Sequence, residues 1–161
     1  IAVYGSLLHT LNHSIVKTAL FLTAGNILAA YGTRHISDVK AMVKEVPATG
    51  VLWMAGLLAI CGFPPFGTFI TELTIAKGAI ESGNYLSAGL YIGFLALIFA
   101  GISKIMISMA MGSGSLIPEK QKSQLILPAA VLLVFSVVLG LYIPDWLSEA
   151  VWQISLKFGA Q

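Results

Sequence analysis

The sequence carries little charge. Charged residues make up 10% of its 161 residues, whereas an ordinary soluble domain is about 25% charged. Hydrophobic residues account for 57%, and the mean hydropathy is +0.89. Such a composition leaves too few charged side chains for the surface of a soluble domain, so we expect an integral membrane protein in contact with the lipid bilayer.

Cysteine is almost absent, since Cys61 is the single one. One cysteine excludes an internal disulfide, and without a CxxC spacing the chain cannot by itself ligate an iron–sulfur cluster or a structural zinc ion. The net charge of +2 is spread over loops without a basic stripe interleaved with aromatics, which argues against nucleic acid. We expect no catalytic residue, cofactor or metal in this chain.

The first residue is Ile1 rather than methionine. The opening segment is already apolar, without a basic leader or a small-residue cleavage site, so no signal peptide is visible. We therefore expect a piece of a longer polypeptide.

Long apolar runs separated by polar links predict an all-α protein with four membrane spans and no soluble domain. The expected elements are a helix over 4–31 that ends before Gly32, a discontinuous helix over 48–82, a helix over 84–111, and a last helix over 124–143.

The second of these runs is interrupted by glycine and proline at Gly62, Pro64, Pro65 and Gly67. Proline lacks an amide hydrogen and opens the helical hydrogen-bond ladder. An unbroken helix of this length would span about 52 Å, whereas the hydrocarbon core is about 30 Å thick. We therefore expect two half-helices of about 15 residues with a break near 63–67. Free backbone groups at membrane depth are tolerated only in a hydrated cavity or inside protein, so the break predicts a site.

Basic residues concentrate in two loops, 32–47 and 112–123. With four crossings these loops lie on the same side, which the positive-inside rule makes cytoplasmic. The expected location is the cell inner (plasma) membrane. The basic residues counted are Arg34, Lys40, Lys44, Lys120 and Lys122, against Lys157 after the last span.

The C-terminal tail reads as a short helix lying in the membrane interface. Asp145 is the expected N-cap, and Trp146 and Trp152 are expected in the aromatic belt. A helical apolar stripe follows, formed by Trp146, Ala150, Val151, Ile154 and Phe158.

Three proton-binding side chains share one face of the first helix. His9, His13 and Lys17 stand at i, i+4 and i+8, a ladder about 12 Å tall at 1.5 Å per residue. Titratable groups at membrane depth are costly and mark ion or proton paths. Histidine relays protons between its ring nitrogens, and a lipid environment disfavours the charged form of a lysine, which then can accept and release a proton. The alternatives are hydrogen-bonded core histidines and a lysine paired with an acid.

Glu72 follows Gly67 by five residues, in the first turns of the second half-helix. The positive helix end favours its charged form and burial opposes it, so we expect a poised carboxylate; the alternative is a surface carboxylate. Lys104 is either a relay group or a snorkelling side chain. Lys77 and Glu81, spaced i, i+4, are expected to form an exposed pair.

The spacing of His9 and His13 is also that of zinc proteases. The glutamate that should follow the first histidine as general base is replaced by Thr10, and no third ligand is evident. This argues against an intramembrane metalloprotease.

Two segments, LLHTLNHSIVKTALFLTAGNILAAYGTRHISDV and GLLAICGFPPFGTFITEL, resemble the antiporter-like membrane subunits shared by complex I, Mrp-type sodium/proton antiporters and group 4 nickel–iron (NiFe) hydrogenases. YGTR, and PPFG followed by a Thr-Glu pair, look closest to hydrogenase-4 component F of the formate hydrogenlyase type. The resemblance covers residues 4 to about 112.

This resemblance implies a 14-helix subunit built from two inverted five-helix repeats, each with a discontinuous helix. Residues 1–112 would be most of the second repeat, and 113–161 the final helix with its tail. The chain would then be the C-terminal third. It lacks the first repeat's glutamate and paired lysine, so alone it should not pump.

In that family the central histidines, lysines and acids form a hydrated proton path. The matching positions are His9, His13 and Lys17 on the helix before the broken one, and Glu72 on the broken helix, as the exit-side group.

The resemblance implies a proton-translocating subunit of a membrane redox complex, linked to a hydrogenase. Nickel–iron and iron–sulfur centres would then lie in partner subunits, and the expected partners are a peripheral redox arm, other membrane-arm subunits and the remainder of its own subunit. The alternatives are an Mrp-type sodium/proton antiporter subunit, a complex I membrane-arm subunit, and a structural anchor whose polar groups lock helices together.

Overall fold

The computed structural model describes residues 1–113, 116–119 and 125–158, and within these ranges the chain is helical without a strand. This confirms the all-α prediction. The elements are α1 (Ala2–Tyr31), a 3-10 turn η1 (Ile36–Asp38), α2 (Met42–Glu45), α3 (Pro47–Ile60), α4 (Gly67–Glu81), α5 (Tyr85–Met111), α6 (Ile126–Leu141) and α7 (Asp145–Lys157).

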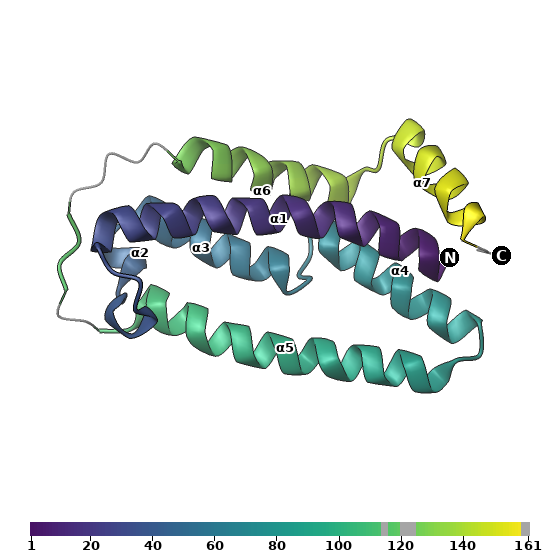
Figure 1. The fold of residues 1–161 in the computed structure, drawn as a ribbon, viewed down its shortest axis with the longest axis horizontal. Coiled ribbons are helices and arrows are strands. Elements are labelled where there is room, and N and C mark those ends of the chain that lie inside the picture. The colour runs from purple at the N-terminus through teal and green to yellow at the C-terminus, as the bar shows by residue number, and fades with distance from the viewer. Residues whose placement is uncertain (114–115, 120–124, 159–161) are drawn as a thin grey trace.

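Helix α1 runs through the middle of the bundle (Figure 1). It packs against α6 on one side and against α3 and α4 on the other, while α5 lies beyond α3 and α4 and packs on these two. One core cluster joins α1, α3, the segment before α4, and α6; its buried members are Val16, Ala19, Ala59, Phe66 and Leu133.

The first helix ends where the sequence predicts. Gly32 caps it with φ 65°, and its amide donates a hydrogen bond to the Leu28 carbonyl. A left-handed cap of this kind favours glycine, which has no Cβ to clash with the backbone.

Two described helices, α1 and α5, are each long and apolar enough to cross a membrane. Helices α6 and α7 qualify together as a bent pair with 77° between their axes. The predicted half-helices are confirmed as α3 with 14 residues and α4 with 15, each shorter than the 20 or so residues that a membrane span needs. The total of four spans stays a prediction.

The link between α1 and α3 and the described residues 112–113 and 116–119 lie at one end of the bundle, and the start of α1 and helix α7 lie at the other (Figure 1). The Glu119 amide donates to the Ala30 carbonyl at 2.9 Å. Lys40 Nζ donates to Ser108 Oγ at 2.5 Å, close to the end of α5. The predicted Lys120 and Lys122 lie outside the described residues. The side of the membrane that this end faces stays a prediction.

The tail helix α7 folds back onto the start of α1. The Tyr4 and Ser148 hydroxyls lie 2.8 Å apart, and the rings of Tyr4 and Trp152 meet edge-on at 6.0 Å. The prediction that Asp145 is the N-cap was wrong. Pro144 occupies that position because its carbonyl accepts the amides of Leu147 and Ser148, and Asp145 is the first helical residue.

Helix α6 contacts the segment between α3 and α4 through a glycine. A Cβ at Gly140 would collide with the Pro65 carbonyl oxygen and with the backbone of Phe66 and Gly67. By contrast, a Cβ at Gly89 on α5 would meet no described atom within 4 Å. The approach of α6 to this segment therefore requires glycine at position 140.

We expect Gly140→Ala to destabilise the protein, because the added methyl must push α6 away from the backbone of the break. Overpacking of this kind costs about 1–3 kcal/mol. The measurement is the thermal unfolding midpoint of the purified full-length subunit. Gly89→Ala is the matched control and should leave the midpoint unchanged or raise it, since alanine favours helix. Equal midpoints for the two variants would contradict the packing described.

Candidate functional site

The discontinuity in the second apolar run lies between Ile60 and Gly67. The predicted break residues Gly62, Pro64, Pro65 and Gly67 lie at this discontinuity. Gly62 has φ +63°, a left-handed conformation that glycine adopts without steric cost. Gly67 is the first residue of α4.

Several backbone groups at the break find partners inside the protein. The Phe63 amide donates to the Leu58 carbonyl at 3.0 Å, and the Phe66 amide donates to the Phe63 carbonyl at 3.1 Å. The buried Thr68 hydroxyl donates to the Ala59 carbonyl at 2.5 Å, which ties the start of α4 to the end of α3. The two half-helices are thus joined by a side chain as well as by the intervening loop.

Two polar side chains press against glycines of the break. A Cβ at Gly62 would collide with the carboxylate of Glu72, and a Cβ at Gly67 would collide with the side-chain oxygen of Asn12. Asn12 is buried on α1; its amide nitrogen donates to the Leu8 carbonyl, and its side-chain oxygen has no hydrogen-bond partner in the described part of the chain. The break therefore brings polar side chains together inside an otherwise apolar bundle.

Glu72 is half-buried and faces the break and α5. Its carboxylate interacts electrostatically with the Cys61 thiol and with the Tyr91 hydroxyl on α5. The carboxylate thus lies against groups of the break and of α5 rather than in bulk solvent.

The histidines of α1 face α4. His9 Nδ1 lies 2.9 Å from the Thr71 hydroxyl oxygen, and the His9 and His13 rings are 5.5 Å apart at 35°. The Thr71 hydroxyl donates to the Thr68 carbonyl at 2.8 Å. The hydroxyl oxygen is then the acceptor toward His9, so Nδ1 carries the proton and Nε2 of a neutral His9 is the ring nitrogen that can accept one.

Lys17 stands one turn beyond His13 on an exposed part of α1. Its Nζ lies 5.6 Å from the centre of the Phe21 ring. The side chain lines a hollow of about 160 Å³ together with Trp53 of α3 and Met106 of α5. The two ion pairs found among the described residues, Lys44 with Glu45 and Lys77 with Glu81, do not include Lys17.

The predicted histidines and the predicted carboxylate therefore lie on different sides of α4. Thr71 points toward the histidines of α1, whereas its neighbour Glu72 points toward the break and α5. The structure joins His9 to α4, and the hydrogen bond that does so is made by Thr71 rather than by the carboxylate.

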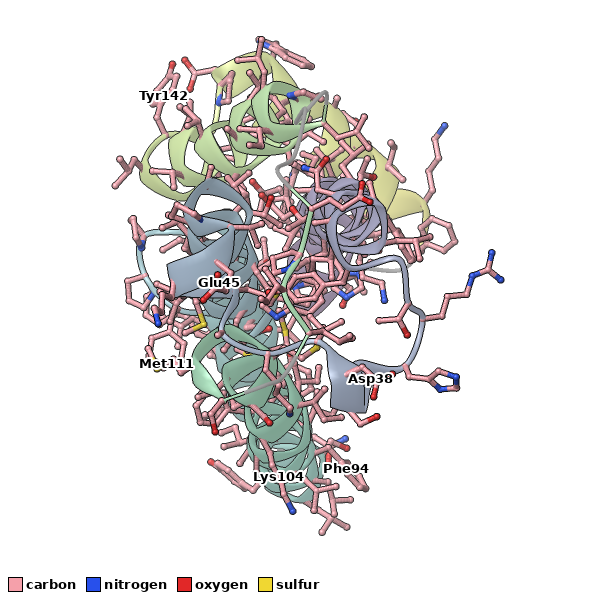
Figure 2. The ribbon with its side chains drawn as sticks, turned by 90° about the vertical axis from the view of Figure 1, so that its left-hand side faces the viewer. Asp38, Glu45, Phe94, Lys104, Met111 and Tyr142 are labelled. Carbon is pink, nitrogen blue, oxygen red and sulfur yellow. The ribbon has the colours of Figure 1, made fainter. Side chains whose placement is uncertain are left out.

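Lys104 is not part of either group. It is exposed, and its side chain projects from α5 away from the other helices (Figure 2). Lys77 and Glu81 form the predicted exposed pair, with 3.6 Å between Nζ and Oε1.

Sequence reasoning missed Thr71, Asn12 and Tyr91. Asn12 gave a usable signal, since it is an amide side chain between two histidines of an apolar helix. Thr71 and Tyr91 gave none, because threonine and tyrosine are common in membrane helices and neither has a distinctive spacing.

Comparison with known proteins shows relatives over most of the chain. It is 33% identical over 152 residues to the hydrogenase-4 component F homolog of Methylacidiphilum infernorum, covering 92% of this chain and 31% of the relative. It is 25% identical over 155 residues to a Na⁺/H⁺ antiporter subunit of Bacillus subtilis, covering 94% and 31%. An NADH-quinone oxidoreductase subunit of Desulforudis audaxviator matches at 35% over 86 residues, covering 53% and 17%.

The chain thus spans about a third or less of these relatives. Among solved structures, a chain of the Mrp complex from Dietzia sp. DQ12-45-1b has the same fold, with a TM-score of 0.74 at 22% identity over 86% of this chain and 34% of that one. The model of the family described as NADH:quinone oxidoreductase/Mrp antiporter, transmembrane, matches residues 1–99. Together with the apolar helices this shows a multi-pass membrane protein that belongs to the NADH:quinone oxidoreductase/Mrp antiporter family.

Proposed function

We propose that the chain is part of an antiporter-like subunit that moves protons across the membrane. The observation that carries this proposal is the juxtaposition at the break, where a half-buried carboxylate lies against Gly62 and a histidine of α1 bonds the next residue of α4. Ionisable groups at membrane depth beside interrupted backbone are typical of ion and proton paths.

The proposed path uses the ladder in order. A proton passes from Lys17 to His13 and then to His9, whose ring lies 5.5 Å from that of His13. The bond from His9 Nδ1 to Thr71 holds the ring so that Nε2 accepts the incoming proton. Water molecules then connect His9 to Glu72 around the start of α4, and Glu72 releases the proton on the side of α5.

The proposed setting is a membrane-bound redox complex of the nickel–iron hydrogenase or formate hydrogenlyase type in the plasma membrane. Its support is the 33% identity to a hydrogenase-4 component F homolog over 92% of the chain. Nickel–iron and iron–sulfur centres would then lie in partner subunits of a peripheral redox arm. The loops 32–47 and 112–123 would face the cytoplasm, since the described parts of both lie at one end of the bundle and the two loops together carry five of the nine lysines and arginines.

A second candidate is an Mrp-type sodium/proton antiporter subunit, which moves ions without a redox partner. The Na⁺/H⁺ antiporter relative from Bacillus subtilis, matched over 94% of this chain, and the fold of the Dietzia Mrp complex favour it.

Glu72→Gln and Lys17→Ala in the full-length subunit should each lower proton transport by about a hundredfold, the lower end of what a positioned proton-transfer group contributes. The glutamine keeps the size of the side chain and removes its titration. The measurement is proton uptake into vesicles containing the intact complex. Glu81→Gln and Lys77→Ala are matched controls on exposed positions of α4 and should transport normally.

Unchanged transport in both Glu72→Gln and Lys17→Ala would remove the site assignment. It would favour a structural anchor whose buried polar groups only hold helices together.

Thr71→Val should slow proton transport about fivefold, because the His9 ring loses one hydrogen bond worth about 1 kcal/mol. Thr74→Val is the control on the same helix, since the Thr74 hydroxyl bonds only its own helix at the Ile70 carbonyl. Equal rates for the two variants would show that the His9 to Thr71 bond has no part in transport.

The complex that co-purifies with the full-length subunit distinguishes the two settings. A nickel–iron hydrogenase large subunit among the co-purifying proteins is the expected result. Sodium-dependent proton transport by a purified complex that contains no redox subunit would instead support the Mrp-type candidate.

A further inference from the structure

A hollow of about 510 Å³ lies between the end of α1, the turn η1, α3 and α5. Its walls are apolar and come from three helices. The wall residues that matter here are Ile27 and Leu28 of α1, Trp53 of α3, and Ile105, Met106 and Met109 of α5. The hollow adjoins the smaller one at Lys17, since Ala24, Trp53 and Met106 line both.

The rim of this hollow is positively charged. Arg34 and His35 line it at the end of the bundle where α1 stops, and both are exposed. Among the described residues, no acidic one lines it. The nearby Asp38 carboxylate accepts hydrogen bonds from the hydroxyls of Thr33 and Ser37, and neither ion pair among the described residues includes Arg34. The cation at the rim is therefore available to an anionic group.

Trp53 forms part of the wall deeper in the same hollow. It is six residues into α3, about 9 Å along its axis from the loop end. Its indole nitrogen is enclosed by protein and closed to solvent, so the ring contributes apolar wall area and offers no contact for a polar group.

We propose that this groove binds an anionic phospholipid, with its phosphate on Arg34 and His35 and an acyl chain along the apolar walls. Basic pockets between membrane helices bind anionic headgroups in this way. Two features fit one amphipathic molecule: a cation at the rim and apolar walls beyond it. This inference is independent of the proposed proton path.

The test places a photo-reactive benzoylphenylalanine at Ile105 of the full-length subunit in native membranes whose phospholipids carry labelled phosphate. Ile105 lines the groove and is 47% exposed. The matched control is Leu97, 71% exposed on the same helix and outside the groove. Illumination should give a lipid adduct at position 105 that is enriched in anionic headgroups relative to the adduct at position 97.

Arg34→Gln should lower this enrichment about fivefold, the factor that corresponds to about 1 kcal/mol for one basic residue near a membrane surface. Arg34→Lys should retain it. Lys44→Gln should also retain it, since Lys44 lies on the same loop, pairs with Glu45 and does not line the groove.

Three results would overturn the proposal. A polypeptide adduct at position 105, seen as a large mass shift, would mean that another helix fills the groove. The same headgroup composition at positions 105 and 97, or no lipid adduct at 105, would mean that the groove selects no lipid. If the adduct at position 105 stays enriched in anionic headgroups in Arg34→Gln, the lipid phosphate does not bind at the rim.

Discussion

The structure depends on hydrogen-bond partners for the backbone amides and carbonyls of an interrupted helix. At membrane depth water does not supply these partners, so the protein must. Between Ile60 and Gly67 the helical ladder stops, and local amide bonds with the Thr68 hydroxyl replace part of it. The remaining backbone is covered at close range by Asn12 of α1 and Gly140 of α6. Both helices can approach because glycine stands at each contact, at Gly67 and at Gly140. The arrangement of α1, α4 and α6 therefore follows from this one requirement.

The same break positions the candidate site. Because α4 restarts at Gly67, Thr71 and Glu72 fall in its second turn, where consecutive side chains diverge by about 100°. Thr71 meets His9 across the α1 interface, and Glu72 turns back to Gly62 and outward to α5. Residues that close the break and residues that bind protons are thus neighbours on one helix. The proposed proton path and the stability of the fold share the same few positions.

The exposed faces of the two long helices, α1 and α5, differ in polarity. On α5 the exposed side chains include Leu86, Leu90, Phe94 and Leu97, as expected for a face in contact with lipid. On α1 the exposed side chains include Ser6, Thr10, Ser14 and Lys17. A face with these polar and charged side chains is unfavourable in contact with lipid. This contrast agrees with the length of the relatives, which are about three times as long as the chain and so hold further polypeptide that can pack on such a face.

Local signals in the sequence determined where the helices begin, stop and break. Gly32, the Pro64–Pro65 pair, and the spacing of Lys77 and Glu81 each act within a turn or two, so they could be predicted along the chain. The His9 to Thr71 bond joins residues 62 positions apart, and no local pattern contains it. Tertiary packing alone decided that Glu72 faces the break and that Lys104 points away from the bundle. A rotation of about 100° separates one residue from the next on a helix, and only contacts with distant elements fix that rotation.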